Sequence, residues 1–316
     1  MIPQTTLDLD AYFQRIGYTG DRTPTLKTLQ GIHYHHAKTI AFENLNPLVK
    51  QPVLLDLPSL QQKLIYGGRG GYCFEQNSLL RSVLLAIGFQ VTNLAARVLW
   101  NVPAGLITPR SHMVLRVELE EESHAGESYI VDVGFGGLTL TTPLLLAPNL
   151  EQHTSHEPFR LIVTDLPATG LPATGLPATG LPATDLPATG LPATDFPVTH
   201  QTYTMQANLN QEWKSLYQFD LQQQQLPDYE VSSWYASTHP KSLFVNSLIV
   251  AKPDTDCRYA LQNNHLTTHY LDGRTERRTL KTVQELRSVL EEVFGLQVGA
   301  IDNLDSALNR FIEPTT

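Results

Sequence analysis

A proline at every fifth position between residues 166 and 200 limits the possible folds of this chain more than any other feature. Seven tandem pentads run from Leu166-Pro-Ala-Thr-Gly170 to Phe196-Pro-Val-Thr-His200. Because proline lacks an N–H group and clashes inside a helix, this spacing excludes a regular helix and an interior strand. A period of five residues is also too short for a solenoid repeat. We therefore expect an extended, mobile surface loop over residues 166–200, with folded structure on either side of it.

The spacing of apolar residues changes near residue 90. Before that point it is helical, most clearly in a stripe that Gly88 ends: Leu80, Val83, Leu84 and Ile87. After it, β-rich runs predict strands at residues 91–100, 111–120, 129–133, 202–205, 213–221, 244–250 and 259–261. An amphipathic helix follows at residues 283–294 and a short one near Leu304 and Leu308. The chain therefore combines helices with an antiparallel sheet or small barrel.

Charge and cysteine content narrow the function classes. The formal net charge of -9 makes non-specific nucleic-acid binding unfavourable. Two cysteines, Cys73 and Cys257, are too few for a disulfide framework and are typical of a reducing compartment. The N-terminus lacks the pattern of a signal peptide, and no stretch reaches the roughly 18 apolar residues of a membrane span. We expect a cytoplasmic protein with neither nucleic-acid nor membrane partners.

Cys73 follows a glycine-rich stretch and precedes the leucine-striped helix. A helix N-terminus offers unpaired N–H groups and a positive dipole end, which stabilise a thiolate. The same N–H groups can stabilise an oxyanion on an attacked thioester, and the glycines let the backbone approach a ligand. A buried structural cysteine explains this pattern equally well, so these residues alone leave both interpretations open.

His112 and Asp132 are the candidate partners of Cys73. The pattern places His112 at the start of a strand and Asp132 at the end of another. A thiol nucleophile needs a base to take its proton, and the imidazole needs an acceptor that fixes its tautomer. Taken singly, an ordinary histidine and a turn-forming aspartate remain simpler explanations. The triad is therefore a hypothesis that spacing alone does not decide.

Five segments, in order along the chain, resemble the arylamine N-acetyltransferase family. They are Ile40-Ala-Phe-Glu-Asn-Leu45, with Ala41 where proline is usual; Arg69-Gly-Gly-Tyr-Cys-Phe-Glu-Gln-Asn77; Ser111-His-Met113; Asp132-Val-Gly-Phe-Gly-Gly137; and Trp234-Tyr-Ala-Ser-Thr-His-Pro240 followed by Phe244. The pentads lie between matched segments and remove none of them.

The resemblance implies an α+β fold with a cysteine-protease-like Cys-His-Asp core. Residues 1–90 would form an N-terminal helical bundle that carries the catalytic cysteine. Residues 91–227 would form a central antiparallel β-barrel with the catalytic histidine and aspartate, interrupted by the insert at 166–200. Residues 228–316 would form a C-terminal α/β lid.

The resemblance also implies a ping-pong acyl transfer. Cys73 would take acetyl from acetyl-CoA, the donor co-substrate, and pass it to an arylamine, arylhydrazine or N-hydroxyarylamine. His112 would act as the base, and Asp132 would orient it. No metal is implied, and His33, His35 and His36 lack the second ligand cluster that a metal site would need.

Further site residues follow from the resemblance. The acceptor pocket would use the aromatic rings of Phe42, Phe74 and Phe135, although each is equally typical of a core. CoA would contact Thr108, Ser111, Gly136, Gly137 and Tyr235. Arg69, Arg110 and Lys241 are basic candidates for its phosphates.

Three alternatives remain at this point. A transglutaminase or cysteine peptidase uses the same order of Cys, His and Asp, but the segments at residues 42–45 and 132–137 favour the acetyltransferase family. An amide synthase of the same family is poorly separated by sequence. A non-catalytic module that recruits a partner through the repeats would not need all three triad residues.

Overall fold

The computed structural model describes residues 6–103, 105–166 and 200–312. The mobile loop expected within the pentads therefore lies outside the described residues, apart from its two ends. The N-terminal part is mainly helical, as its apolar spacing predicts. Its elements are α1 (Leu9–Ile16), α2 (Leu26–Thr39), β1 (Phe42–Glu43), α3 (Leu45–Leu48), α4 (Leu57–Leu60), the π-helical segment η1 (Gln61–Tyr66) and α5 (Cys73–Ile87).

Helix α5 is the leucine-striped helix, and its ends explain why it forms there. The carboxylate of Glu75 accepts a hydrogen bond from the backbone N–H of Tyr72, which closes the first turn (3.1 Å). Gly88 ends the helix in the left-handed conformation, with φ of 106°. Its apolar face packs against two strands of the central sheet, β2 and β3.

The central sheet has seven strands in the order β5-β4-β3-β2-β8-β7-β6, all paired antiparallel. Its two edges approach each other, because the N–H of Asn149, after β5, donates to the carbonyl of Leu161 on β6 (2.7 Å). The sheet is thus nearly closed, which confirms the predicted barrel. The strands are β2 (Gln90–Val98), β3 (Arg110–Glu118), β4 (Ser128–Val131), β5 (Leu144–Leu145), β6 (Phe159–Leu166), β7 (His200–Leu209) and β8 (Glu212–Phe219), with a 3₁₀ turn η2 (Glu122–His124) before β4.

The ends of the pentad segment correct the prediction of a loop over all of residues 166–200. Strands β6 and β7 remain paired up to Leu166 and His200, which are Cα partners. Neither residue is a proline, since the prolines of these two pentads are Pro167 and Pro197. Both residues therefore keep a backbone N–H and can extend the ladder.

A second sheet has five strands in the order β1-β9-β10-β11-β12. Strand β1 comes from the N-terminal part and pairs with β9, so this sheet crosses the boundary expected near residue 90. The division into three domains otherwise remains a prediction. The C-terminal elements are α6 (Leu226–Thr238), α7 (Leu243–Asn246), β9 (Ile249–Pro253), β10 (Cys257–Gln262), β11 (His265–Tyr270), β12 (Thr275–Thr279), α8 (Val283–Ser288), the π-helical segment η3 (Val289–Val293) and α9 (Leu304–Asn309).

The strand predicted at residues 244–250 is wrong in its first half, where α7 forms instead. The hydroxyl of Ser242 accepts from the N–H of Phe244 (3.2 Å), and the Asn246 amide donates to the carbonyl of Ser242 (2.8 Å). These local bonds favour a helical turn over an apolar β-run. They also direct Phe244 toward Tyr72, with ring centroids 5.4 Å apart.

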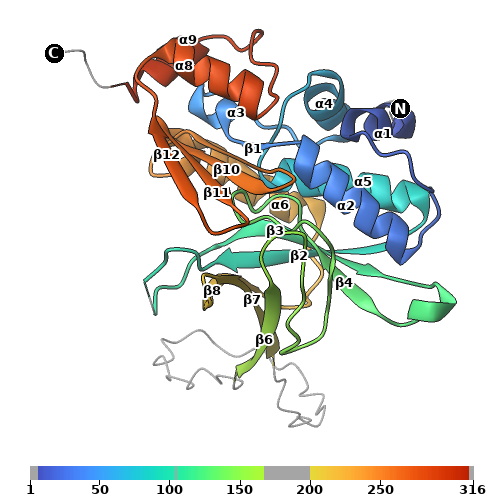
Figure 1. Ribbon diagram of the computed structural model, residues 1–316. Coiled ribbons are helices and arrows are strands. Elements are labelled where there is room, and N and C mark those ends of the chain that lie inside the picture. The colour runs from blue at the N-terminus through green and yellow to red at the C-terminus, as the bar shows by residue number, and fades with distance from the viewer. Residues whose placement is uncertain (1–5, 104, 167–199, 313–316) are drawn as a thin grey trace, which may run out of the picture.

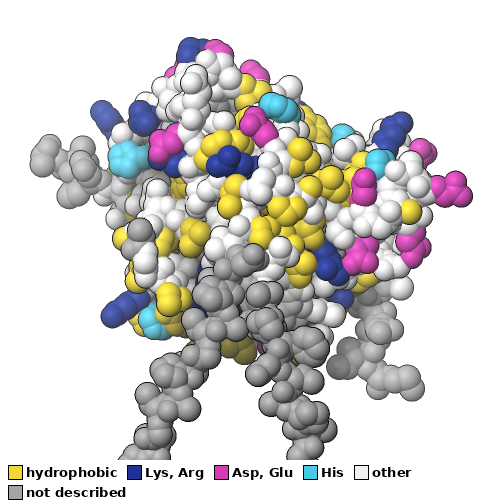
Figure 2. Space-filling model, turned by 90° about the horizontal axis from the view of Figure 1, so that it is seen from below, with side chains coloured by type: hydrophobic (Ala, Val, Ile, Leu, Met, Phe, Trp, Pro, Cys, Tyr) yellow, Lys and Arg dark blue, Asp and Glu magenta, His cyan; other side chains and the backbone are white. Residues whose placement is uncertain are grey.

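Figure 1 shows the five-stranded sheet above the seven-stranded one, with α2 and α5 beside them. Helix α6 packs on β3, close to the start of α5. On the face seen in Figure 2, charged side chains lie mostly toward the rim and apolar ones gather in the middle; the described part of that face carries no continuous basic stripe. Among the described residues, no helix combines the length and apolar character needed to cross a membrane.

Candidate active site

Cys73 is the first residue of α5 and is buried, with 3% of its surface exposed. Its Sγ atom lies 3.8 Å from the carbonyl oxygen of Ser111, which directly precedes His112 on β3. The packing of α5 on β3 therefore brings the cysteine and the histidine together across two elements. Both predicted partners of the cysteine, His112 and Asp132, lie here.

His112 and Asp132 form a buried hydrogen-bonded pair. The Nε2 atom of His112 lies 2.7 Å from Oδ2 of Asp132, and both side chains are almost fully enclosed. Asp132 directly follows β4, which pairs with β3 beyond His112. Burial alone lowers the pKa of His112, but the charge and hydrogen bond of Asp132 outweigh it and, together with the nearby Cys73 thiol, hold this pKa well above its usual value. Burial raises the pKa of Asp132, but His112 and the hydrogen bonds from Asn77 and Gly134 lower it more. The pKa of this carboxyl therefore lies below its usual value.

Asn77 completes the surroundings of Asp132 and is a residue that sequence reasoning missed. Its amide nitrogen donates to Oδ1 of Asp132 (3.0 Å) and to the carbonyl of Met113 (2.8 Å), and its oxygen accepts from the N–H of Val133 (3.1 Å). A signal was present in the sequence, because Asn77 lies four residues after Cys73 and thus on the same face of α5. The N–H of Gly134 also donates to Oδ1 of Asp132 (2.9 Å).

Two aromatic rings enclose His112. The ring centroid of Phe135 lies 5.2 Å from that of the imidazole, and that of Tyr217 lies 4.9 Å away. Phe135 was predicted at the site; Tyr217, on β8, was not. Burial, with the nearby charge of Asp132, raises the pKa of Tyr217 well above its usual range, so its phenol stays neutral.

The glycines before Cys73 pack closely against the protein's own atoms. A Cβ atom on Gly70 would lie 2.0 Å from the carbonyl oxygen of Ala41, and one on Gly71 would lie 2.7 Å from the Glu75 carboxylate. The glycine-rich stretch therefore allows close packing on the chain before β1 and on α5, and the approach of a ligand to it remains a prediction.

Arg69 is engaged inside the protein and is not free to bind a phosphate, contrary to expectation. Its guanidinium contacts Glu43 (2.6 Å) and Asn46 (3.1 Å), and Lys63 joins Glu43 (3.7 Å) to Glu75 (2.6 Å). An acidic group buried on β1 thus recruits the cation. Of the other basic candidates, Arg110 pairs with Asp220 (2.5 Å) and Lys241 is exposed.

Two of the three acceptor candidates lie in or beside the turn of residues 132–139, which we name the catalytic turn because it begins at Asp132. Phe135 contacts His112, and Phe42, on β1, lies beside Gly136, whose added Cβ would stand 3.6 Å from its ring. Phe74 instead packs in the core, with Tyr72 and Tyr229 rings 5.7 and 5.8 Å away.

The candidates for CoA contact occupy different settings. Thr108 donates its hydroxyl to the carbonyl of Val98 (2.8 Å), which fixes the loop before β3. Ser111 is half-buried beside Cys73. Gly136 has φ of 84°, and space is open where a Cβ on Gly137 would be. Tyr235, on α6, is 47% exposed and stacks on His239 at 4.5 Å.

The three clustered histidines of α2 point to three different places. Their nearest partners are the carbonyl of Asp132 for His33 (3.2 Å), the carbonyl of Ile16 for His35 (3.1 Å), and Tyr12 and Gln76 for His36 (2.8 and 3.2 Å). Within the described ranges, no group of three His, Cys, Asp or Glu side chains is arranged to hold a metal.

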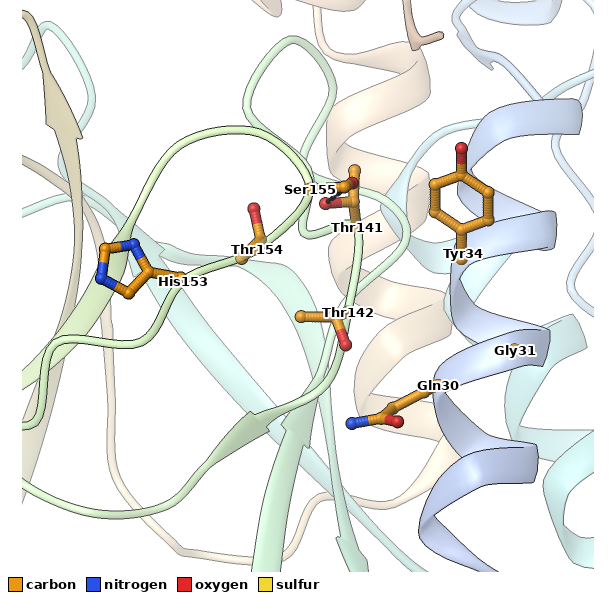
Figure 3. A pocket seen from close by; sticks show the side chains of 8 residues that line it. All are labelled: Gln30, Gly31, Tyr34, Thr141, Thr142, His153, Thr154 and Ser155. Atoms are coloured by element: carbon orange, nitrogen blue, oxygen red, sulfur yellow. Dashed lines mark hydrogen bonds between the residues drawn. The ribbon is translucent and has the colours of Figure 1, made fainter. Parts of the chain in front are cut away.

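An open pocket of about 430 Å³ lies between α2 and the loop after Leu140. Figure 3 shows Gln30 and Tyr34 of α2 on one side and Thr141, Thr142 and Ser155 on the other. None of the predicted site residues lines this pocket.

Comparison with known proteins shows the family to which the chain is similar. The N-acetyltransferase family model matches residues 25–168 and 193–303, and the residues skipped between these ranges fall in the pentads. The arylamine N-acetyltransferase of Mycobacterium tuberculosis is 38% identical over 93% of this chain and 91% of its own. A Salmonella typhimurium relative named arylamine N-acetyltransferase / N-hydroxyarylamine O-acetyltransferase is 32% identical over 93% and 90%.

A solved structure shares the fold over nearly the whole length. The Mycobacterium marinum arylamine N-acetyltransferase in complex with CoA superposes with a TM-score of 0.80 at 33% identity, covering 97% of this chain and 100% of that one. The family match, the relatives and the fold agree, and the chain belongs to the arylamine N-acetyltransferase family.

Proposed function

We propose that this protein transfers acetyl from acetyl-CoA to an arylamine through a thioester on Cys73. The observation that carries the proposal is the position of His112 between Asp132 and Cys73. Its Nε2 atom contacts Asp132 (2.7 Å), and the Cys73 thiol lies beside the same imidazole ring. An imidazole held by a buried carboxylate is the arrangement that activates a neighbouring thiol.

In the first half-reaction the proton of the Cys73 thiol moves to the neutral imidazole of His112. The charge of Asp132 stabilises the imidazolium that forms. The thiolate attacks the carbonyl carbon of acetyl-CoA, so that a new C–S bond to Cys73 forms and the C–S bond to CoA breaks. The CoA thiolate takes the proton back from His112 as it leaves. The backbone N–H groups at the start of α5, where Cys73 is the first residue, would stabilise the transient oxyanion.

In the second half-reaction His112 acts as a base. The amine nitrogen attacks the thioester carbonyl, its proton passes to the imidazole, and the Cys73 thiolate leaves. The enzyme returns to its thiolate–imidazolium form and the product is an N-acetylated arylamine. The same steps acetylate an arylhydrazine on nitrogen or an N-hydroxyarylamine on oxygen, and the name of the Salmonella typhimurium relative supports the latter.

The proposed substrate contacts are those that the family resemblance implies. We assign the aromatic acceptor to Phe135 and Phe42, with Phe74 supporting them from the core. We assign CoA to the side of Thr108, Ser111, Gly136, Gly137 and Tyr235; the CoA-bound Mycobacterium marinum relative supports a CoA site in this fold. We also propose a cytoplasmic location, since both cysteines are free thiols.

A single-turnover assay tests the proposal. Protein treated with acetyl-CoA and freed of excess donor is mixed with an arylamine, an arylhydrazine or an alkylamine of similar basicity. We expect N-acetylated product from the two aromatic acceptors and little from the alkylamine. Phe135→Ala should weaken this preference more than it slows acetylation of Cys73. Equal transfer to all acceptors, or none, would contradict an arylamine acceptor.

A further inference from the structure

His33 is a buried polar side chain that the mechanism above does not use. It lies on α2 with no measurable exposure. Its Nε2 atom is 3.2 Å from the main-chain carbonyl oxygen of Asp132, and its Nδ1 atom has no hydrogen-bond partner among the described residues. An unpaired buried acceptor destabilises a fold by about 1–3 kcal/mol, so packing alone favours an apolar residue at this place.

The direction of this hydrogen bond is fixed by chemistry. Burial lowers the pKa of His33 to about 4, so the imidazole is neutral near neutral pH and carries one N–H group. A carbonyl oxygen only accepts, so the proton is on Nε2 and His33 donates to Asp132.

Among the described residues, the carbonyl of Asp132 has one further donor, the hydroxyl of Thr139 (3.1 Å). Thr139 lies in the same turn as Asp132, so this second bond is internal to the turn, which Arg258 on β10 also holds through the carbonyl of Thr139 (3.0 Å). The Thr139 hydroxyl also accepts from the N–H of Phe135 (3.3 Å) and thus belongs to the turn's internal structure. The bond from His33 comes from a different element and is the one that ties the carbonyl to α2.

An open pocket lies between helix α2 and the chain that follows the turn, with Gln30 and Tyr34 on one side and Thr141 and Thr142 on the other (Figure 3). Beside this pocket, the hydrogen bond from His33 joins the helix to the turn.

We propose that His33 is a positioning residue, which holds the backbone of Asp132 so that its carboxylate stays in line with Nε2 of His112. The inference rests on the proposed function, because it assumes that Asp132 serves catalysis through His112. Without the bond, Asn77 still holds the turn to α5, but the carbonyl of Asp132 is released from α2, so the contact of 2.7 Å lengthens and the imidazolium loses part of its stabilisation.

Four variants test this. His33→Leu removes both ring nitrogens and fills the space with an apolar side chain. His33→Gln places an amide N–H near the position of Nε2, whereas in His33→Asn the amide lies near that of Nδ1 and does not reach Asp132. Thr28→Val is the matched control, because Thr28 is buried on the same helix but bonds only toward its own N-terminal side, at Thr25 and Asp21.

The readouts are the single-turnover rate of acetyl-Cys73 formation across pH, and the melting temperature. We expect His33→Leu and His33→Asn to acetylate about 10- to 100-fold more slowly, since small displacements of a catalytic group have effects of that order. The alkaline limb of the rate should move to lower pH, because His112 then loses its proton more easily. The groups that face His112 are Asp132, Cys73 and Tyr217, and none of them is changed.

His33→Gln should recover most of the rate and the wild-type alkaline limb, and Thr28→Val should behave as wild type in both. A His33→Leu protein with wild-type rate and pH profile would show that His33 is only packing. If His33→Leu does not fold, equal rates for the Gln and Asn variants would overturn the inference equally well. Failure of the proposed function itself would be seen separately, as a wild-type protein that acetyl-CoA does not acetylate.

Discussion

The backbone of Gly134 lies so close to Cys73 that a Cβ atom added to the glycine would stand 2.6 Å from the Cα atom of the cysteine. It would also lie 3.1 Å from the amide nitrogen of Asn77. Because a backbone atom cannot move aside as a flexible side chain can, Gly134→Ala should displace α5 or the catalytic turn. Overpacking of this kind destabilises proteins by about 1–3 kcal/mol. We expect a lower melting temperature and a large loss of Cys73 acetylation.

Gly299→Ala is the control for this change. A Cβ at Gly299 would meet no atom of the described residues within 4 Å, and its backbone is not left-handed. It should melt and react as wild type does. A Gly134→Ala protein with normal activity would show that the contact between the turn and Cys73 is not needed.

Asp132→Asn tests the orienting carboxylate. The two oxygens of Asp132 accept from His112, Asn77 and Gly134, so an amide must turn its N–H₂ toward at least one donor. By analogy with other triads we expect acetyl-Cys73 formation to fall on the order of 10³-fold or more. Asp272→Asn, at an exposed aspartate, controls for the change of charge. A rate near wild type would make Asp132 a structural residue.

The same variant has a signature in stability against pH. A histidine with a raised pKa contributes stability that is complete below its unfolded value of about 6.5 and lost as pH rises through the folded value. For His112 the folded value is raised to about 10. The gap in melting temperature between wild type and Asp132→Asn should therefore be widest near neutral pH or below and narrow steadily as pH rises toward that value. A gap that is constant or widens would contradict the raised pKa.

The paired strand ends at Leu166 and His200 define how the pentads can be removed. Because these residues are Cα partners, an Asn-Gly turn in place of residues 167–199 closes the hairpin directly. The triad and the acceptor residues lie elsewhere, so we expect both half-reactions to be close to wild type. The matched control replaces residues 167–199 with a Gly-Ser linker of the same length. This control removes the pentad sequence but keeps the length of the connection. A shortened protein that folds but does not react would show that the pentads contribute to activity.

The sequence predicted the parts of this site that depend on local pattern. The leucine stripe marked α5, and the motifs around Cys73, His112 and Asp132 marked three side chains that the structure brings together. Asn77 lay within one of these motifs and could have been found from its helical spacing. Tyr217 could not, because nothing in a strand pattern distinguishes it from the other tyrosines until β8 is placed beside β2.

Errors arose where tertiary partners decide the outcome. The charge of Arg69 suggested a phosphate ligand, but its guanidinium forms an ion pair with the buried carboxylate of Glu43 on β1. The apolar run after Phe244 suggested a strand, but side-chain bonds from Ser242 and Asn246 close a helical turn first. The glycines at residues 70 and 71 have a packing role that the sequence pattern did not predict, because their close neighbours, Ala41 and Glu75, are known only from the fold.

The central claim is that acetyl resides on Cys73 between the two half-reactions. The most direct test is to mix the protein with acetyl-CoA alone and to locate acetyl by peptide mass spectrometry, for wild type, Cys73→Ala and Cys257→Ala. We expect one acetyl group, on the peptide that carries Cys73, in wild type and Cys257→Ala, none in Cys73→Ala, and its complete discharge when an arylamine is added. Acetyl on another residue, or steady product formation by a protein that is never acetylated, would contradict the account.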